Sequence, residues 1–184
     1  MSKDLRPIRV TPDSPQAAAL AKYPQDSDGY IIGLFRVFAN SLRFLTGKGV
    51  VNLLDDQSPL SLREREITIL RTCANNKCEY EWSVHVATFA NAAKFSPDQI
   101  LASTQIDADC WTPSEQLLIN VIDGFCHQGK LSADLLTQFQ DCWSVEQQLE
   151  IMALIGNYHT VSFVANAATL PLEPGCPTFP NHVL

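Results

Sequence analysis

The sequence predicts a single all-α domain, and three observations carry this prediction. The long periodic segments repeat their hydrophobic residues at helical spacing rather than at the alternate spacing of strands. Hydrophobic residues make up 46% of the 184 residues, and there are only eight glycines. Capping boxes, in which Ser or Thr precedes Glu or Gln by three positions, begin at Ser61, Thr112 and Ser144. A chain of this length can bury one core of its own.

Start and stop signals place the helices along the chain. Proline at a first helical position favours a helix start, and prolines beyond the last turn favour its end. In chain order, we expect helices at about 14–22, 30–46, 61–75 and 78–94, a short one from 97, and further helices at 112–126, from 132, and from 144 to about 170.

The predicted helix that follows Cys78 carries polar groups on its apolar face. Because residues i, i+3, i+4 and i+7 share one side of a helix, Cys78, Glu81 and His85 should point the same way. Trp82 and Phe89 lie on the same side and would supply an apolar wall. Titratable groups on an apolar face are typical of a cleft that handles protons or thiols. The structural alternative is a buried Glu81–His85 hydrogen bond that only braces two helices.

Glu66 repeats this pattern in the preceding helix. It lies inside the apolar stripe that runs from Leu62 to Cys73. Two interpretations are open. Glu66 either neutralises a neighbouring Arg at the edge of the stripe, or it faces the carboxylate and imidazole of the next helix. The short connection at 74–77 would make the two helices neighbours, which favours the second interpretation.

A family resemblance is carried by LSLREREITILRTCANNKCEYEWSVHVATFANAAKFSPDQI at residues 60–100. This stretch resembles the carboxymuconolactone decarboxylase family, which also contains the AhpD-like alkylhydroperoxidases. LFRVFANSLRFL at 34–45 is similar to the entry helix of that family. GNYHTVSFVANAATLPLEPG at 156–175 is similar to its long final helix and tail.

The resemblance implies an AhpD-like helical domain in which an antiparallel helix pair carries the site. That domain would span 34–184, with the family core at about 60–125 and residues 1–33 as an N-terminal extension. The resemblance also implies a homo-oligomer, expected as a dimer, trimer or hexamer. The apolar residues on all sides of the last predicted helix favour the same conclusion, although a helix at the centre of one subunit would show the same pattern.

The resemblance separates two branches of the family at one position. The peroxidase branch has Cys-x-x-Cys followed by His, with a Glu on the preceding helix. Matched residue by residue, these fall on Cys78, Glu81, His85 and Glu66, so the second Cys is replaced by Glu81. Without it the motif cannot close its own disulfide. The decarboxylase-like branch therefore matches this sequence better.

The expected function is cofactor-free acid–base chemistry, either decarboxylation or proton transfer, on a small carboxylated lactone or related acid. Glu81 would orient and charge His85, and Glu66 would either share the proton or have its pKa raised by its apolar surroundings. Arg63, Arg65, Arg71 and Arg43 are candidates for holding substrate carboxylates. Two alternatives are an alkylhydroperoxidase that uses Cys78 as the reactive thiol, and a non-catalytic protein that binds a small molecule. A metal site ranks well below acid–base chemistry because only one His stands in the cluster.

Composition restricts the partners and the location. A formal net charge of −7 and a pI near 4.9 argue against nucleic acid or an anionic membrane as a partner. The first residues lack the apolar core of a secretory signal, so we expect a cytoplasmic protein. The six cysteines show no framework spacing and are expected as free thiols.

Overall fold

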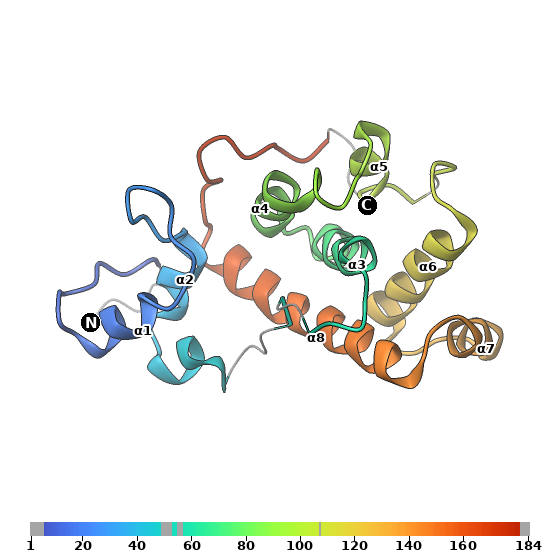
Figure 1. Ribbon diagram of the computed structural model, residues 1–184, viewed down its shortest axis with the longest axis horizontal. Helices are drawn as coiled ribbons and strands as arrows, with labels where there is room; N and C mark the ends of the chain where they lie inside the picture. The colour runs from blue at the N-terminus through green and yellow to red at the C-terminus, as the bar shows by residue number, and fades with distance from the viewer. Residues whose placement is uncertain (1–5, 49–52, 55–56, 107, 181–184) are drawn as a thin grey trace.

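The computed structural model describes residues 6–48, 53–54, 57–106 and 108–180, and these ranges contain helices but no strand (Figure 1). The predicted all-α class is confirmed. The helices are α1 Pro15–Leu20, α2 Gly33–Phe38, α3 Leu62–Asn75, α4 Glu79–Phe89, α5 Pro97–Ala102, α6 Pro113–Gln128, α7 Ala133–Cys142 and α8 Val145–Ala167, together with a short π-helical segment η1 Phe44–Lys48. None of the described helices is both long enough and apolar enough to cross a bilayer.

The predicted capping boxes begin three of the helices. Ser61, Thr112 and Ser144 each accept a hydrogen bond from the backbone three residues on, and the Glu or Gln there bonds back to the backbone of the cap. Each box satisfies backbone N–H groups that the first turn of a helix leaves without partners. Local sequence therefore fixes where α3, α6 and α8 start.

The single helix expected at 30–46 is wrong, because α2 ends at Phe38 and the next helical turn starts after Ser41. The Asn40 amide donates to the carbonyl of Val37 and so caps the chain there. The Ser41 hydroxyl accepts from the N–H of Phe44 and opens the following turn. Short polar side chains that bond to nearby backbone compete with helix continuation, which explains the break.

Helix α3 is the centre of the domain. Ten consecutive residues, Arg65 to Ala74, are buried, because α4, α6 and α8 pack around it. A helix that is covered on all sides must satisfy its polar side chains internally. This requirement explains why the buried charged side chains of α3, Arg65, Glu66 and Arg71, are all paired, as described below.

Helices α3 and α4 form the expected antiparallel pair. The turn between them is tight: Cys78 N–H bonds to the Cys73 carbonyl at 2.9 Å, with Lys77 in the left-handed region at φ 52°. At the other end Arg63, in the first turn of α3, donates to the carbonyls of Ala93 and Lys94 just beyond α4. The start of α3 therefore lies beside the end of α4.

The C-terminal tail crosses the outer face of α4 (Figure 1). The Ser83 hydroxyl donates to the Pro177 carbonyl, and the N–H of Phe179 donates to Glu79 at 2.6 Å. The ring of Phe179 packs on Trp82 with centroids 5.2 Å apart. The tail therefore covers the side of α4 that faces away from α3.

Candidate active site

His85 and Glu66 form a buried pair across the α3–α4 contact. The imidazole Nδ1 lies 2.7 Å from Glu66 Oε2, and the side chains are only 4% and 1% exposed. Glu66 precedes the turn that joins the two helices and His85 follows it, so the antiparallel hairpin brings them together. Both interpretations of Glu66 are met, because it faces the imidazole and also pairs with the neighbouring Arg65.

Tyr158 of α8 forms a hydrogen bond with the other imidazole nitrogen. Its hydroxyl lies 2.8 Å from His85 Nε2, and the two rings meet edge to face at 85°. In a neutral imidazole one nitrogen donates and the other accepts. A Glu66 carboxylate accepts from Nδ1–H, which leaves Nε2 to accept from the Tyr158 hydroxyl. Burial raises the pKa of Tyr158 well above its usual value, so the phenol holds its proton.

Arg65 and Phe89 complete the surroundings of this pair. The Nε of Arg65 lies 3.2 Å from Glu66 Oε1, so the carboxylate has a cation on one oxygen and the imidazole on the other. The Arg65 guanidinium also lies over the Phe89 ring at 5.4 Å. The same ring is 5.2 Å from the imidazole. Phe89 therefore stands beside His85 as an apolar wall, as the helical spacing indicated.

Glu81 does not orient the imidazole, contrary to the sequence-based hypothesis, because Glu66 and Tyr158 hold both ring nitrogens. The Glu81 carboxyl is 4% exposed, and its Oε1 has no hydrogen-bond partner. Burial raises the pKa of Glu81 to about 7, while the nearby charge of His85 opposes this shift. A carboxyl with such a pKa exchanges its proton at neutral pH, which suits proton transfer.

The two thiols near the site are buried and held in the protonated form. Cys73 and Cys78 are both fully buried and free. Burial raises the pKa of Cys78 to about 11 and that of Cys73 well above its usual value. Since the thiolate is the reactive species, this environment is the opposite of an activated cysteine. Within the described ranges, no group of three or more His, Cys, Asp or Glu side chains is arranged to hold a metal ion.

Arg63 and Arg71, expected to hold substrate carboxylates, are both engaged by the protein itself. Arg71 is buried and donates to both oxygens of Asp123, at 2.6 and 2.7 Å, and to the Gln105 carbonyl at 2.5 Å. Arg63 forms an ion pair with Glu115 in addition to its two backbone contacts. Arg65 is the arginine of α3 that lies at the imidazole–carboxylate pair. Nothing in the sequence distinguishes these roles, because they depend on partners in other helices.

Trp82 also lies in different surroundings from those expected. Its indole N–H donates to the Ser103 hydroxyl at 2.9 Å, and its ring packs on Phe179 of the tail. It therefore joins α4 to the end of α5 and to the tail. Tyr158 was not predicted as a site residue. Its only signal in the sequence is that it carries a hydroxyl group within the apolar last helix.

Comparison with known proteins gives one family. Residues 45–123 match the model of the carboxymuconolactone decarboxylase family. The matched region contains α3, α4, α5 and most of α6, and so includes Glu66, Glu81 and His85 but not Tyr158. No curated protein matches the chain. The segment that carries the helix pair joining Glu66 to His85 is therefore similar to the carboxymuconolactone decarboxylase family.

Proposed function

We propose that this protein is an enzyme that uses Glu66, His85 and Tyr158 for cofactor-free acid–base chemistry on a small carboxylated lactone or related acid. The observation that carries the proposal is the buried 2.7 Å contact between Glu66 and His85, with Tyr158 on the second imidazole nitrogen. A buried carboxylate on Nδ1 fixes the tautomer and stabilises the imidazolium that forms when Nε2 takes up a proton. Nε2 is therefore the atom that exchanges protons with substrate.

A decarboxylation at this site would have two steps, loss of CO₂ and protonation of carbon. The bond between the substrate carbon and its carboxylate breaks, CO₂ leaves, and the electron pair is delocalised into the neighbouring carbonyl as an enolate. His85, which has taken up a solvent proton at Nε2 before this step, then gives that proton to the carbon and returns to the neutral form. Arg65 balances the charge of the Glu66 carboxylate.

Tyr158 controls access to Nε2. Because its hydroxyl already bonds to this nitrogen, a substrate reaches the proton either by displacing the hydroxyl or through it. The high pKa of Tyr158, caused by burial, keeps the phenol protonated and suits it to donate a hydrogen bond to the enolate oxygen.

Thiol peroxidase chemistry is the competing proposal, with Cys78 attacking the peroxide. Burial of Cys78 and its pKa of about 11 weigh against it. A family member that binds a small molecule without turnover is the third class. The acid–base enzyme requires His85, the thiol enzyme requires Cys78, and the non-catalytic protein has neither activity. One variant at each residue therefore distinguishes the three proposals.

The test is an assay of carboxylated γ-lactones and β,γ-unsaturated acids for CO₂ release and for uptake of solvent deuterium at carbon. We expect wild-type activity to fall by about 10²–10⁴-fold in His85→Ala and to be retained in the matched variant Cys78→Ser. Peroxide reduction that is lost in Cys78→Ser would instead support the thiol enzyme. Ligand binding with neither activity would support the non-catalytic class.

A further inference from the structure

The guanidinium group of Arg65 is only partly used by the protein itself. Its Nε donates to Glu66 Oε1 at 3.2 Å, whereas Nη1 and Nη2 form no hydrogen bond with any residue that the structure describes. The side chain is 9% exposed, and neither Nη atom is among the buried side-chain atoms that lack a partner. Both Nη atoms therefore reach solvent, with their N–H groups free to donate.

The other arginines that the sequence singled out are placed differently. Arg71 uses Nε, Nη1 and Nη2 for Asp123 and for backbone carbonyls. Arg63 uses Nε for an ion pair and Nη1 for the carbonyls beyond α4. Arg43 is exposed between α2 and η1. Of these four arginines, Arg65 combines a free pair of Nη atoms with a place at the carboxylate–imidazole pair.

Phe89 connects the free end of Arg65 to the imidazole. The Arg65 Cζ lies 5.4 Å from the centre of the Phe89 ring, and the His85 ring lies 5.2 Å from the same centre. Phe89 is half-buried, so its ring borders on solvent at this point. A small acid that lies against this ring would have its carboxylate at Arg65 and its carbon skeleton beside His85.

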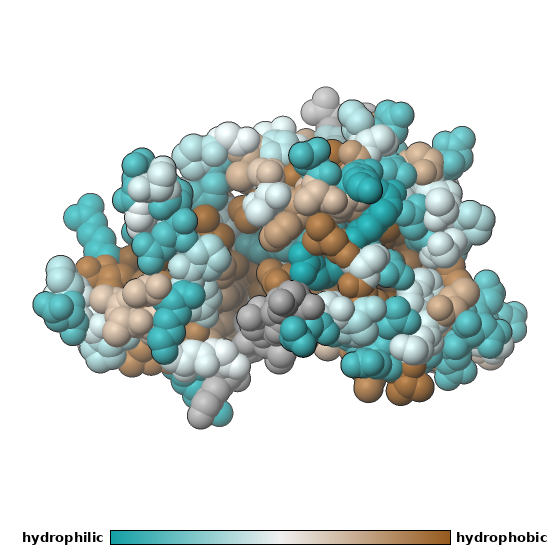
Figure 2. Space-filling model, viewed as in Figure 1, coloured by the Kyte–Doolittle hydropathy of each residue, from teal (hydrophilic) through white to brown (hydrophobic). Residues whose placement is uncertain are grey.

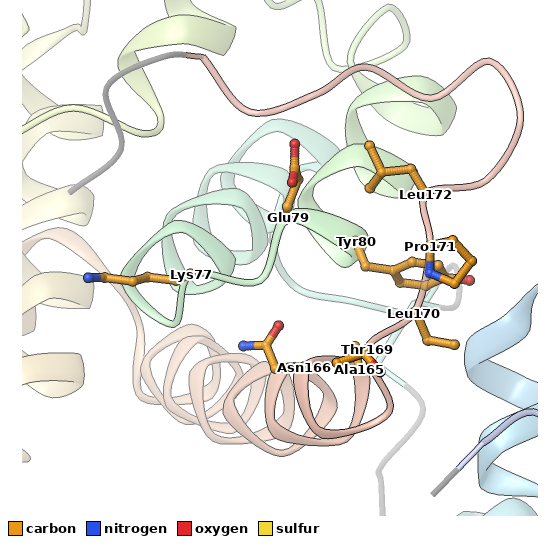
Figure 3. A pocket seen from close by; sticks show the side chains of 9 residues that line it. All are labelled: Lys77, Glu79, Tyr80, Ala165, Asn166, Thr169, Leu170, Pro171 and Leu172. Carbon is orange, nitrogen blue, oxygen red and sulfur yellow. The ribbon is translucent and has the colours of Figure 1, made fainter.

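The cavity in Figure 3 does not serve this centre. Its volume is about 420 Å³, and it lies where α4 begins, with Glu79 and Tyr80 in its lining. Phe89 is the last residue of α4, so the cavity lies at the opposite end of that helix. The Glu79 carboxylate would also repel an acid there. An acid would instead approach Arg65 from solvent, next to the Phe89 ring.

We propose that Arg65 binds a carboxylate of the substrate acid through Nη1 and Nη2, while its Nε stays on Glu66. The inference rests on the proposed function, because it supplies that acid–base centre with its substrate-binding residue. Two parallel N–H···O bonds from one guanidinium match the two oxygens of a carboxylate. This contact stabilises the ionised carboxylate. In a decarboxylation, Arg65 therefore holds a carboxylate that the product keeps, and not the one that leaves as CO₂.

The bound carboxylate would also favour proton uptake by His85. In the free protein one cation, Arg65, faces one anion, Glu66. The substrate adds a second negative charge, and an imidazolium next to the two carboxylates restores the balance. Burial raises the pKa of the nearby Glu81 carboxyl to about 7, so in mildly acidic solution Glu81 adds little charge of its own. Substrate binding at Arg65 would therefore help to protonate the residue that later donates the proton.

The experiment uses the full chain labelled with ¹⁵N-histidine, with acetate as the probe and neutral acetamide, which has a similar shape, as its control. The His85 signals are assigned with His85→Gln and followed at about pH 6, where acetate is ionised and a carboxyl with a pKa near 7 is largely protonated. Sodium acetate replaces sodium chloride at constant ionic strength. We expect a saturable shift of the His85 signals with acetate and no saturable shift with acetamide. The signals of His127 and His159 serve as internal references.

Three variants test the role of Arg65. Arg65→Gln removes the cation and should weaken acetate binding about tenfold or more, the effect of losing hydrogen bonds to a charged group. Arg65→Lys keeps a charge beside Glu66 but loses the planar fork, so its affinity should be intermediate. It replaces Arg65→Gln if circular dichroism shows that the glutamine disturbs the fold. The matched control is Arg63→Gln, which removes an arginine of the same helix that pairs with Glu115, and it should bind acetate like the wild type.

Several results would overturn the inference. His85 signals that do not respond to acetate, that respond equally to acetamide, or that respond as strongly in Arg65→Gln exclude Arg65 as the carboxylate-binding residue. Binding that is weakened in Arg63→Gln but not in Arg65→Gln assigns the carboxylate to Arg63 instead. Acetate binding that requires Arg65, without turnover of any acid, counts against the proposed function alone. Turnover that requires His85 but has an unchanged KM in Arg65→Gln counts against the role of Arg65 alone.

Discussion

Glu81 is a buried carboxyl whose environment ties stability to pH. Burial raises its pKa from 4.5 to about 7. Below pH 4.5 the group is protonated in both the folded and the unfolded chain. Between these two values the unfolded chain has released the proton and the folded chain has not, so the free energy of unfolding falls as pH rises. Above pH 7 the penalty is complete, at about 3 kcal/mol.

The first prediction follows for Glu81→Gln, which keeps the shape and cannot ionise. Its stability relative to the wild type should increase by about 2 kcal/mol between pH 5 and pH 8, because only the wild type is penalised on ionising. Urea unfolding of both proteins at the two pH values measures this difference, and all groups that titrate alike in both cancel. A difference that is constant with pH would show that Glu81 is ionised in the folded protein throughout.

The second prediction concerns Tyr158→Phe, which keeps the ring against His85 and removes only the hydroxyl. His85 Nε2 then loses its partner, and we expect a stability loss of about 1 kcal/mol. If the hydroxyl assists the enolate, kcat should fall about 10–100-fold with little change in KM, since the contact strengthens only in the transition state. A rise in KM with kcat unchanged would assign Tyr158 to substrate binding instead.

Helical spacing could place Cys78, Glu81 and His85 on one side of α4, but it could not say which partner each side chain meets. Glu66 was within reach of prediction because a short turn joins its helix to that of His85. Tyr158 was not, because it lies 73 residues from His85 and meets it only through the packing of α8. Contacts of this kind depend on the whole core.

Helix boundaries were likewise predictable where the signal is local and not where it depends on residues distant in sequence. Capping boxes are local, so the starts at Ser61, Thr112 and Ser144 were predictable from three or four residues each. The break after Phe38 was not, because one of the two bonds from the Asn40 amide goes to the carbonyl of Arg6, which lies 34 residues away. Burial of α3 on all sides likewise decides which of its arginines are structural.

The third prediction belongs to the contact between α3 and α6. Arg71 is buried and bidentate to Asp123, so Arg71→Ala leaves that carboxylate with only the Asn75 amide as a donor and takes the Arg71 donor from two backbone carbonyls. We expect a loss of about 3 kcal/mol in the free energy of unfolding. In a double-mutant cycle with Asp123→Ala, the two losses should be clearly less than additive. Additive losses would mean that the pair does not act as a unit.

At the scale of the whole molecule, one side of α8 is left uncovered. Its inner face is buried against the domain, whereas an outer stripe exposes large apolar side chains. Leu149 is 60% exposed and Phe163 is 61% exposed, with Val145 and Met152 on the same side of the helix. Exposed apolar residues lie over the first turns of α8 at the lower edge of Figure 2. Exposed apolar side chains gathered on one side of a helix are typical of an interface.

The last prediction is that a second copy of the chain covers this stripe. Because the helix carries apolar residues on its outer as well as its inner side, light scattering at micromolar concentration should report a mass above 20.4 kDa. Leu149→Glu with Phe163→Glu places two charges on the stripe and should reduce the mass to that of one chain. The matched control is Leu101→Glu, which places a charge on an exposed leucine of α5 away from the stripe and should leave the mass unchanged. If the wild type already runs as one chain, the stripe is not a contact between copies, and the outer face of α8 is open to solvent.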